Sequence, residues 1–330
     1  MSKNWQTYSA MTAALAVSAD DLLVRDKSDT TDHGTEGTVL RLPWEGLLGL
    51  SGITPGGRLT LESGVPVSTT DQTAKGTLYY TPYVHDFVRL YNGTRPTLYT
   101  FTERSLALTL TSGKNYDVFL YDNSGTLTLE LSAAWTNDTT RADALAWQAG
   151  VGCVKSGAAT RLHLGTIRAS GTDITESSFV KTDAAAKSFV WNRYNTVRRT
   201  MRVIDSTNSY TYTTATWRQS RGSANNQCEF VCGDAMVSGA FAMAHTNQTG
   251  IVGRATGIGV DSTTAPTGLV GYESTNIGAG AHVAHNHYTL SAGYHYVAQL
   301  EISDASGVCT WYGDAGLTYL QSGLSVEVDT

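Results

Sequence analysis

The sequence predicts an all-β fold of short antiparallel strands, and three observations carry that prediction. The 330 residues include 47 Thr, 17 Tyr and 33 Gly but only 6 Pro, a composition that favours strands joined by glycine turns. Apolar and polar residues alternate with a period of two along several segments, as in sheets with one wet face. Turn signals recur about every 8 to 15 residues, which is typical of β-sandwiches and barrels.

The N-terminal segment is the only one that favours a helix. Trp5 to Val17 is rich in Ala, Leu and Met, so we expect a short helix or arm there. Asp20 to Leu48 contains a short apolar run, a polar turn and an alternating segment, which together predict a small strand pair. The Gly- and Pro-rich stretch Ser51 to Gly57 follows as a turn or linker, so a boundary is expected between residues 50 and 76.

From Gly76 onward the hairpin signals become strong. In Thr126 to Leu131 the Leu side chains share one face and the polar side chains the other, so the period excludes a helix. Further strands are expected at Leu98–Leu110, Tyr116–Asp122, Arg161–Arg168, Ser188–Tyr194, Thr200–Ile204, Tyr210–Arg218, Gln227–Cys232, Gly239–His245, Tyr294–Ile302 and Gly307–Trp311. These patterns divide the chain into an N-terminal segment (residues 1–75) and two β-sandwich domains (residues 76–180 and 181–330).

Charge and cysteine content narrow the range of partners. The 23 Lys and Arg against 29 Asp and Glu give a net charge of −6 without a basic cluster, so we expect no nucleic-acid partner. No apolar run is long enough for a membrane helix and no secretion signal opens the chain, so we expect neither membrane insertion nor export. The 4 Cys are too few for a disulfide framework, which predicts buried thiols and folding in the cytoplasm.

The sequence holds none of the common catalytic motifs, namely G-x-S-x-G, H-E-x-x-H, the phosphate-binding loop or a G-x-G-x-x-G that opens a helix. We therefore expect no catalytic residue, no cofactor and no enzymatic activity. One alternative stays open, because the two carboxylates of a glycoside hydrolase need only meet in space at about 5 to 10 Å. Asp205, Glu229 and Asp234 are the candidates, although solvated strand ends and turns explain them more simply.

Histidines are concentrated in Gly280 to Tyr296. His285 and His287 lie two residues apart, so on a strand both point to the same face. One chain supplies two imidazole ligands, whereas three chains around an axis would supply six, enough for an octahedral transition-metal site. A polar sheet surface is the alternative interpretation. We therefore assign His285 and His287 as candidate metal ligands at a trimer axis only.

Several segments resemble proteins of a known class. Tyr116–Trp135 (YDVFLYDNSGTLTLELSAAW), Phe189–Arg199 (FVWNRYNTVRR), Tyr210–Gln219 (YTYTTATWRQ) and Tyr294–Ser325 resemble virion structural proteins of tailed bacteriophages. Asp20 to Leu48, which begins with a D-L-x-V-x-D pattern, is similar to the segment that attaches many phage fibre and spike chains to the particle. The resemblance rests on framework and turn residues, so no catalytic residue can be carried over.

The resemblance implies a homotrimeric component of the virion, assembled in the host cytoplasm as a short tail fibre, a head fibre or a capsid decoration protein. Its N-terminal segment would bind other virion proteins. The attachment residues would be Asp20, Leu22, Val24, Asp26, Leu40 and Leu42. The β-rich C-terminal part would project outward, where it could contact a glycan of the host surface.

Two other classes of function stay open at this point. The first is a tailspike-like enzyme that cleaves glycans. The second is a free carbohydrate-binding module whose exposed aromatic side chains stack on sugars. The candidates for such stacking are Tyr79, Tyr80, Tyr83, Trp217 and Trp311. Core packing explains these aromatic residues more simply, because large aromatic side chains are mostly buried in β-domains.

Overall fold

The computed structural model describes residues 21–26, 38–43, 54–316 and 320–330. Within these ranges every regular element is a strand except η3 (Ser220–Gly222), a single 3-10 turn, so the all-β prediction is confirmed. No helix in the described ranges is long and apolar enough to span a membrane. The expected helix or arm at Trp5–Val17 and the attachment residue Asp20 lie outside the described residues.

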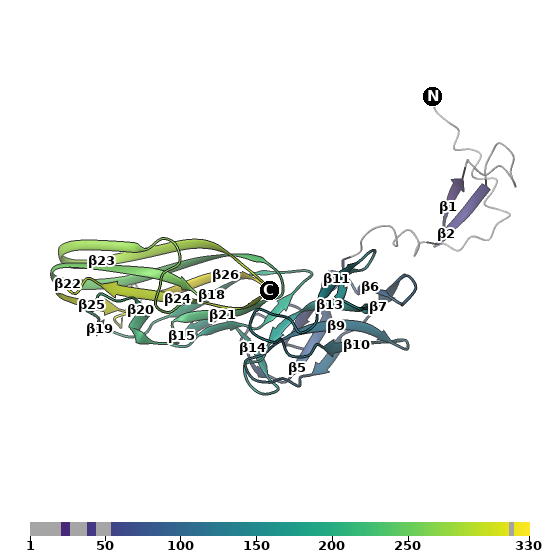
Figure 1. Cartoon of the computed structure of the whole chain (residues 1–330), viewed down its shortest axis with the longest axis horizontal. Helices are drawn as coiled ribbons and strands as arrows, with labels where there is room; N and C mark the ends of the chain where they lie inside the picture. Colours follow the sequence, from purple (N-terminus) through teal and green to yellow (C-terminus); the bar gives the residue numbers. More distant parts are fainter. Residues whose placement is uncertain (1–20, 27–37, 44–53, 317–319) are drawn as a thin grey trace, which may run out of the picture.

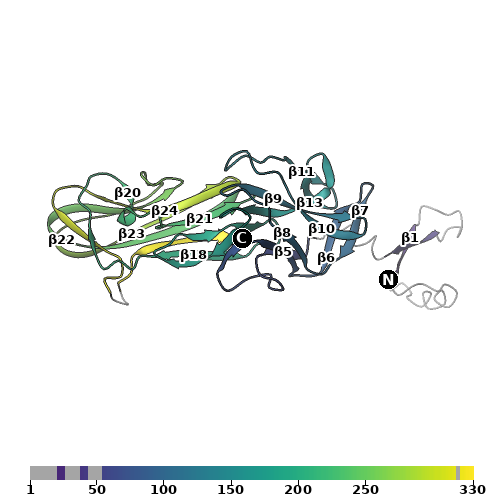
Figure 2. The same cartoon turned by 90° about the horizontal axis from the view of Figure 1, so that it is seen from below.

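The N-terminal strand pair is present. β1 (Asp21–Asp26) and β2 (Thr38–Pro43) pair in antiparallel register, which sets Leu22 opposite Leu42 and Val24 opposite Leu40. The pair forms a two-stranded sheet of its own. The remaining described strands form two units that lie end to end along the long axis of the molecule (Figures 1 and 2).

The first unit contains a three-stranded sheet, a hairpin and a six-stranded sheet, all antiparallel. The strands are β3 (Gly57–Thr60), β5 (Thr77–Pro82) and β8 (Arg104–Ala107); β6 (Phe87–Tyr91) and β7 (Pro96–Thr100); and β9 (Asn115–Asn123), β10 (Thr126–Leu131), β11 (Leu145–Gln148), β12 (Gly152–Lys155), β13 (Ala158–Arg168) and β17 (Val190–Asn192). Leu127 and Leu129 are buried in its core, as the period-two pattern predicts.

The second unit is built from one hydrogen-bonded sheet of 13 strands. Two of its strand pairs, β15–β18 and β16–β21, are parallel. Its strands are β4 (Gln72–Lys75), β14 (Thr175–Ser178), β15 (Val180–Thr182), β16 (Ala186–Ser188), β18 (Arg198–Ile204), β19 (Tyr210–Thr211), β20 (Arg218–Gln219), β21 (Gln227–Cys232), β22 (Met236–Val260), β23 (Gly271–Leu290), β24 (Gly293–Ser303), β25 (Val308–Tyr312) and β26 (Gly323–Asp329). A single core is shared by β18, β21, β22, β24 and β26.

The β22–β23 hairpin bends over the end of the second unit and joins its two layers. The first half of β22 pairs with β26 and the second half with β24, and both partners contribute residues to the shared core. Arg254 donates a hydrogen bond to Thr246, eight positions earlier, although eight residues of straight strand would span roughly 26 Å. The register shifts after Thr249, and Gly250 supplies the positive φ of 96° at the bend.

The structure corrects several strand boundaries. Leu98–Leu110 is interrupted between β7 and β8, and Ser188–Tyr194 holds the end of β16 and the short strand β17. Most of Tyr210–Arg218 is loop, because the Tyr212 hydroxyl donates to the Thr216 carbonyl at 2.5 Å and closes the chain locally. Gly239–His245 is only part of a strand of 25 residues.

A buried network of charges joins the two units. Asp117 on β9 is fully buried and accepts hydrogen bonds from Trp135 Nε1, Arg141 Nε, His163 Nε2 and Thr166 Oγ1 at 2.8 to 3.1 Å. The same Arg141 reaches the Gly233 carbonyl of the second unit. The first unit is thus tied through Asp117 to the β21–β22 turn.

Arg193 completes this network. Its Nε donates to His163 Nδ1 at 2.7 Å and its Nη1 to Asp234 at 2.9 Å. Because arginine only donates, His163 Nδ1 is an acceptor, and the hydrogen on Nε2 points to Asp117. Burial lowers the pKa of His163 and keeps it neutral, while the hydrogen bonds and charges around Asp117 overcome burial and lower the pKa of that carboxyl.

Candidate functional site

The outer face of the β22–β23 hairpin is the most distinctive exposed surface of the second unit. Residues at even positions in the first half of β22 face the core, so the odd positions face outward. Among these, Val237 is 57% exposed and Phe241 41% exposed, and Val283 on β23 is 45% exposed. We call this surface the β22–β23 face; its outward residues are Val237, Gly239, Phe241, Met243 and His245 on β22, and Val283, His285 and His287 on β23.

The two histidines predicted as metal ligands lie together on this face. His285 stands opposite Phe241 and His287 opposite Gly239, and both side chains are exposed. Their ring centroids are 4.7 Å apart with an angle of 87° between the planes. The His287 ring lies against Gly239, where an added Cβ would come within 3.1 Å of it. Neither imidazole has a hydrogen-bond partner among the described residues, so both are available to bind a ligand.

The other two histidines of Gly280–Tyr296 are held inside. His282 is 2% exposed, and burial together with nearby Arg254 lowers its pKa to about 4. His295 is 4% exposed and contacts Asp261 Oδ2 at 2.8 Å through Nδ1 and the Ser291 carbonyl at 2.9 Å through Nε2. Burial alone would lower the pKa of His295, but its hydrogen bonds, that to Asp261 foremost, raise it to about 10.

Two grooves border the β22–β23 face. One has a volume of about 330 Å³ and is lined by Phe241, Met243 and Arg202 among others. The second has a volume of about 430 Å³ and is lined by His245, Tyr312 and Leu320 among others. Apolar side chains line both grooves beside polar ones such as Arg202 and His245, and the grooves extend the β22–β23 face toward β18 and β25.

A metal site within one chain is not formed. Among the residues that the structure describes, no group of three or more His, Cys, Asp or Glu side chains lies close enough to hold an ion. His285 and His287 supply two imidazoles, and the other ligands would have to come from elsewhere, as from further copies of the chain.

Each of the three carboxylates considered for glycoside cleavage is bound to another side chain of the chain. Asp205 binds Arg221 Nη1 at 2.7 Å, Glu229 accepts from the Tyr294 hydroxyl at 3.0 Å, and Asp234 binds Arg193. Sequence reasoning missed Asp183, which shares Arg221 Nη1 with Asp205 at 2.9 Å. Burial alone would raise the pKa of Asp183, but hydrogen bonds from Ser206 and Arg221 lower it, so Asp183 and Asp205 form an ion cluster around the Arg221 guanidinium.

Several other predicted residues can be placed. Four of the attachment residues stand on facing positions of β1 and β2, and Asp26 is paired with Thr38. All four cysteines are free and buried, as predicted. Tyr80 and Trp311 are each 1% exposed and belong to the core, whereas Tyr83 is 45% exposed.

No protein-family model and no curated protein sequence matches this chain. Weak likenesses exist to insecticidal proteins of Bacillus thuringiensis. A Cry1Da tryptic core variant is 8% identical with a TM-score of 0.20, and 78% of this chain covers 48% of it. Cry7Ca1 is 8% identical with a TM-score of 0.17, and 87% of this chain covers 55% of it. Cry8Ea1 is 6% identical with a TM-score of 0.16, and 84% of this chain covers 52% of it.

This chain thus spans about half the length of those toxins. Likenesses of this strength carry no argument about fold or activity.

Proposed function

We propose that this protein is a non-enzymatic structural component of a tailed-phage particle, a homotrimer that is attached through its N-terminal strand pair. The sequence resemblance supports the place in the virion. The observation that carries the trimer is the β22–β23 face, where exposed apolar side chains surround two unpartnered imidazoles. Exposed apolar patches of this kind are typical of protein interfaces.

A second copy of the chain fits this face better than a sugar does. Arg202 on β18 borders this face and has no ion-pair partner among the described residues, whereas Arg198 is already paired with Asp329 on β26 at 3.4 Å. A free charge at the edge of an apolar surface can be matched by a carboxylate of the next copy around an axis. Three copies would bring six imidazoles to that axis, which is a full octahedral set for a transition metal. The C-terminal unit would then project from the particle, where it could meet a host-surface glycan.

The test is the molar mass of the full chain, measured by light scattering after size exclusion. We expect three times 35.3 kDa, persisting at nanomolar concentration. The double variant Phe241→Glu/Val283→Glu should be a monomer, because it places charge in the buried interface. Val84→Glu is the matched control, since Val84 is 64% exposed and lies in the first unit. A wild-type chain that is monomeric at every concentration contradicts the trimer.

Metal content is a separate measurement on the same samples. Elemental analysis should find one transition-metal ion per three chains, lost in His285→Ala/His287→Ala and kept in Thr289→Ala on the same strand. A trimer that binds no metal would disprove the metal assignment alone.

Attachment is tested on the particle. Leu22→Asp and Leu40→Asp, introduced into the phage that encodes the chain, should lower its copy number in purified particles. A truncation for the same purpose should end before Thr54, because β3 and the buried Leu59 belong to the core of the first unit.

A further inference from the structure

The buried charge network between the two units holds a histidine at its centre. The His163 side chain on β13 is 0% exposed, with 3.0 Å from its Nε2 to Asp117 Oδ1 and 2.7 Å from its Nδ1 to Arg193 Nε. Each ring nitrogen therefore has one partner, a carboxylate on one side and a guanidinium on the other. Because the guanidinium stays protonated and only donates, its contact with His163 requires a neutral imidazole.

Arg193 also links this ring to the second unit. Its Nη1 donates to Asp234 at 2.9 Å and its Nη2 to the Gly233 carbonyl at 3.4 Å, and both residues belong to the turn between β21 and β22. That turn packs closely on the first unit, since a Cβ added to Gly233 would come within 2.4 Å of Thr166 Oγ1 on β13. The guanidinium of Arg193 thus holds the turn and the His163 ring at the same time.

The charges of the network cancel while the His163 ring is neutral. Asp117 and Asp234 supply two negative charges, and Arg141 and Arg193 supply two positive ones. A proton on the ring would add a positive charge that nothing in this set balances. A buried charge without a partner is unfavourable, so the closed network disfavours the protonated ring.

The remaining groups around the ring do not supply a free negative charge. The Phe119 ring lies 5.6 Å from the His163 ring, and the Lys155 ammonium lies 5.8 Å from the centre of that phenyl ring. Lys155 is itself paired with Asp143 at 2.9 Å. Burial raises the pKa of the Cys153 thiol, which lies within range of the same arginines and carboxylates, so this thiol stays uncharged at neutral and acid pH.

Protonation of His163 makes its contact with Arg193 repulsive. A protonated imidazole donates from both nitrogens, whichever way the ring is turned. One N–H still meets Asp117, but the other meets the N–H of Arg193 Nε across 2.7 Å. Arg193 is the partner that can move away, because its side chain is 15% exposed and Asp234, to which it is bonded, is 60% exposed.

We propose that the junction between the two units is acid-sensitive: a proton on His163 displaces Arg193, and the β21–β22 turn is then released from the first unit. We call the junction closed when Arg193 contacts His163 and the turn, and open when it does not. Every group involved belongs to one chain. The proposal therefore depends neither on a place in a virion nor on the trimer.

The pH at which the junction opens follows from the two forms of His163. Burial lowers its pKa in the closed form, whereas a ring that meets water in the open form returns to the usual value of about 6.5. The closed form is therefore fully favoured above pH 6.5 and loses this advantage as the pH falls below it. Burial would raise the pKa values of Asp117 and Asp234, but hydrogen bonds and arginines lower them, so both carboxylates stay ionised here.

The experiment is amide hydrogen exchange of the full chain at pH 7.5 and pH 5.0, measured by mass spectrometry and corrected for the intrinsic effect of pH. The readouts are the peptides that contain the β21–β22 turn and the Tyr294 amide, which donates to the Asp138 carbonyl of the first unit at 2.9 Å. Each pH unit below 6.5 favours the open form about ten-fold, so the opening constant should rise about 30-fold. An opening constant that is equal at both pH values in the wild type would overturn the proposal.

Substitution of the histidine assigns this change to one ring. His163→Gln keeps a polar side chain that does not titrate, so its opening constant should rise less than about three-fold between the two pH values. His85→Gln is the matched control and should keep the full rise, because His85 lies in the first unit but contacts the Phe87 amide, outside the network. An equal rise in His163→Gln would show that another group opens the junction and would refute the role given to His163.

A second variant tests the displaced arginine and does not depend on the folding of His163→Gln. Arg193→Gln keeps the histidine but lacks the charge that is repelled and the contacts that hold the turn. Its turn should already exchange at least about ten-fold faster than that of the wild type at pH 7.5, with little further change at pH 5.0. A turn that is as protected in Arg193→Gln as in the wild type would show that Arg193 does not hold it.

Discussion

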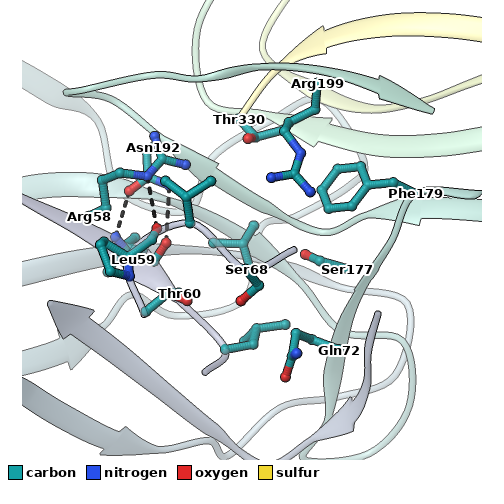
Figure 3. A pocket seen from close by; sticks show the side chains of 14 residues that line it. Arg58, Leu59, Thr60, Ser68, Gln72, Ser177, Phe179, Asn192, Arg199 and Thr330 are labelled. Carbon is teal, nitrogen blue, oxygen red and sulfur yellow. Dashed lines mark hydrogen bonds between the residues drawn. The ribbon is translucent and has the colours of Figure 1, made fainter. Parts of the chain in front are cut away.

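Two pairs of arginines lie where the two units meet, and their surroundings differ. Arg141 and Arg193 are matched by Asp117 and Asp234, with ion-pair distances of 3.0 and 2.9 Å. Arg58 and Arg199 line a small hollow between the units together with Thr330 (Figure 3), and neither is paired with an Asp or Glu side chain among the described residues. Arg58 is buried, whereas Arg141, Arg193 and Arg199 are half-buried, so the two places differ mainly in the partners that the chain supplies.

The difference indicates what each place is for. Charges that the chain itself neutralises hold the two units together and leave nothing for a ligand to do. A buried charge without an oppositely charged side chain beside it, such as that of Arg58, costs stability instead. The same reasoning separates the histidines, since His163 and His295 are fully bonded whereas His285 and His287 are not.

The largest expected effect on stability comes from breaking the ion pair between Arg141 and Asp117. Asp117→Asn should lower the free energy of unfolding by about 3 to 5 kcal/mol, because it leaves Arg141 without its carboxylate partner beside a buried, uncharged group. Denaturant titration measures the loss. Asp234→Asn is the control, since Asp234 is 60% exposed and its loss should cost under about 1 kcal/mol. Equal losses in both variants would show that burial of Asp117 does not matter.

A smaller effect is expected at alkaline pH from His295. Its folded pKa of about 10 lies above the usual value of 6.5, so its stabilisation is complete below pH 6.5 and is lost as pH rises through 10. Between pH 7 and 10 the wild type should lose at least about 2 kcal/mol more stability than His295→Gln, which does not titrate. Parallel curves for the two proteins would contradict the raised pKa.

The sharpest test of the comparison pairs two equivalent substitutions. Arg193→Gln should cost about 2 kcal/mol in unfolding free energy, because it removes hydrogen bonds to His163 and Asp234. Arg199→Gln should change stability by less than about 1 kcal/mol, since only stacking on Phe179 is lost and repulsion of Arg58 is relieved. A larger loss of stability for Arg199→Gln would mean that a group of the chain already neutralises the charge of Arg199.

Local patterns predicted most of the strands. In Thr126–Leu131 each residue's face follows from its immediate neighbours, so alternation alone places β10. β22 was underestimated, because Gly and Ala occupy many of its positions and weaken the alternation on which the prediction depends. Tyr210–Arg218 alternates well but has few strand partners, and a lone sequence does not show which partners exist.

The candidate sites, like the strands, were predictable only where local spacing along the sequence determines them. Spacing placed His285 and His287 on one face, but whether that face is outward depends on the core formed by Ala284 and Leu290. The hollow was not predictable, because Arg58, Gln72 and Arg199 come from distant strands of two units. Nothing in the local pattern of each residue distinguishes it from an ordinary surface side chain.

The bend of the β22–β23 hairpin has a mechanical consequence. Because one hairpin belongs to both layers, neither layer can be peeled away while the other stays intact. A pull that separates the layers must rupture backbone hydrogen bonds in both at once, instead of unzipping them one after another. The second unit should therefore unfold under force in a single step.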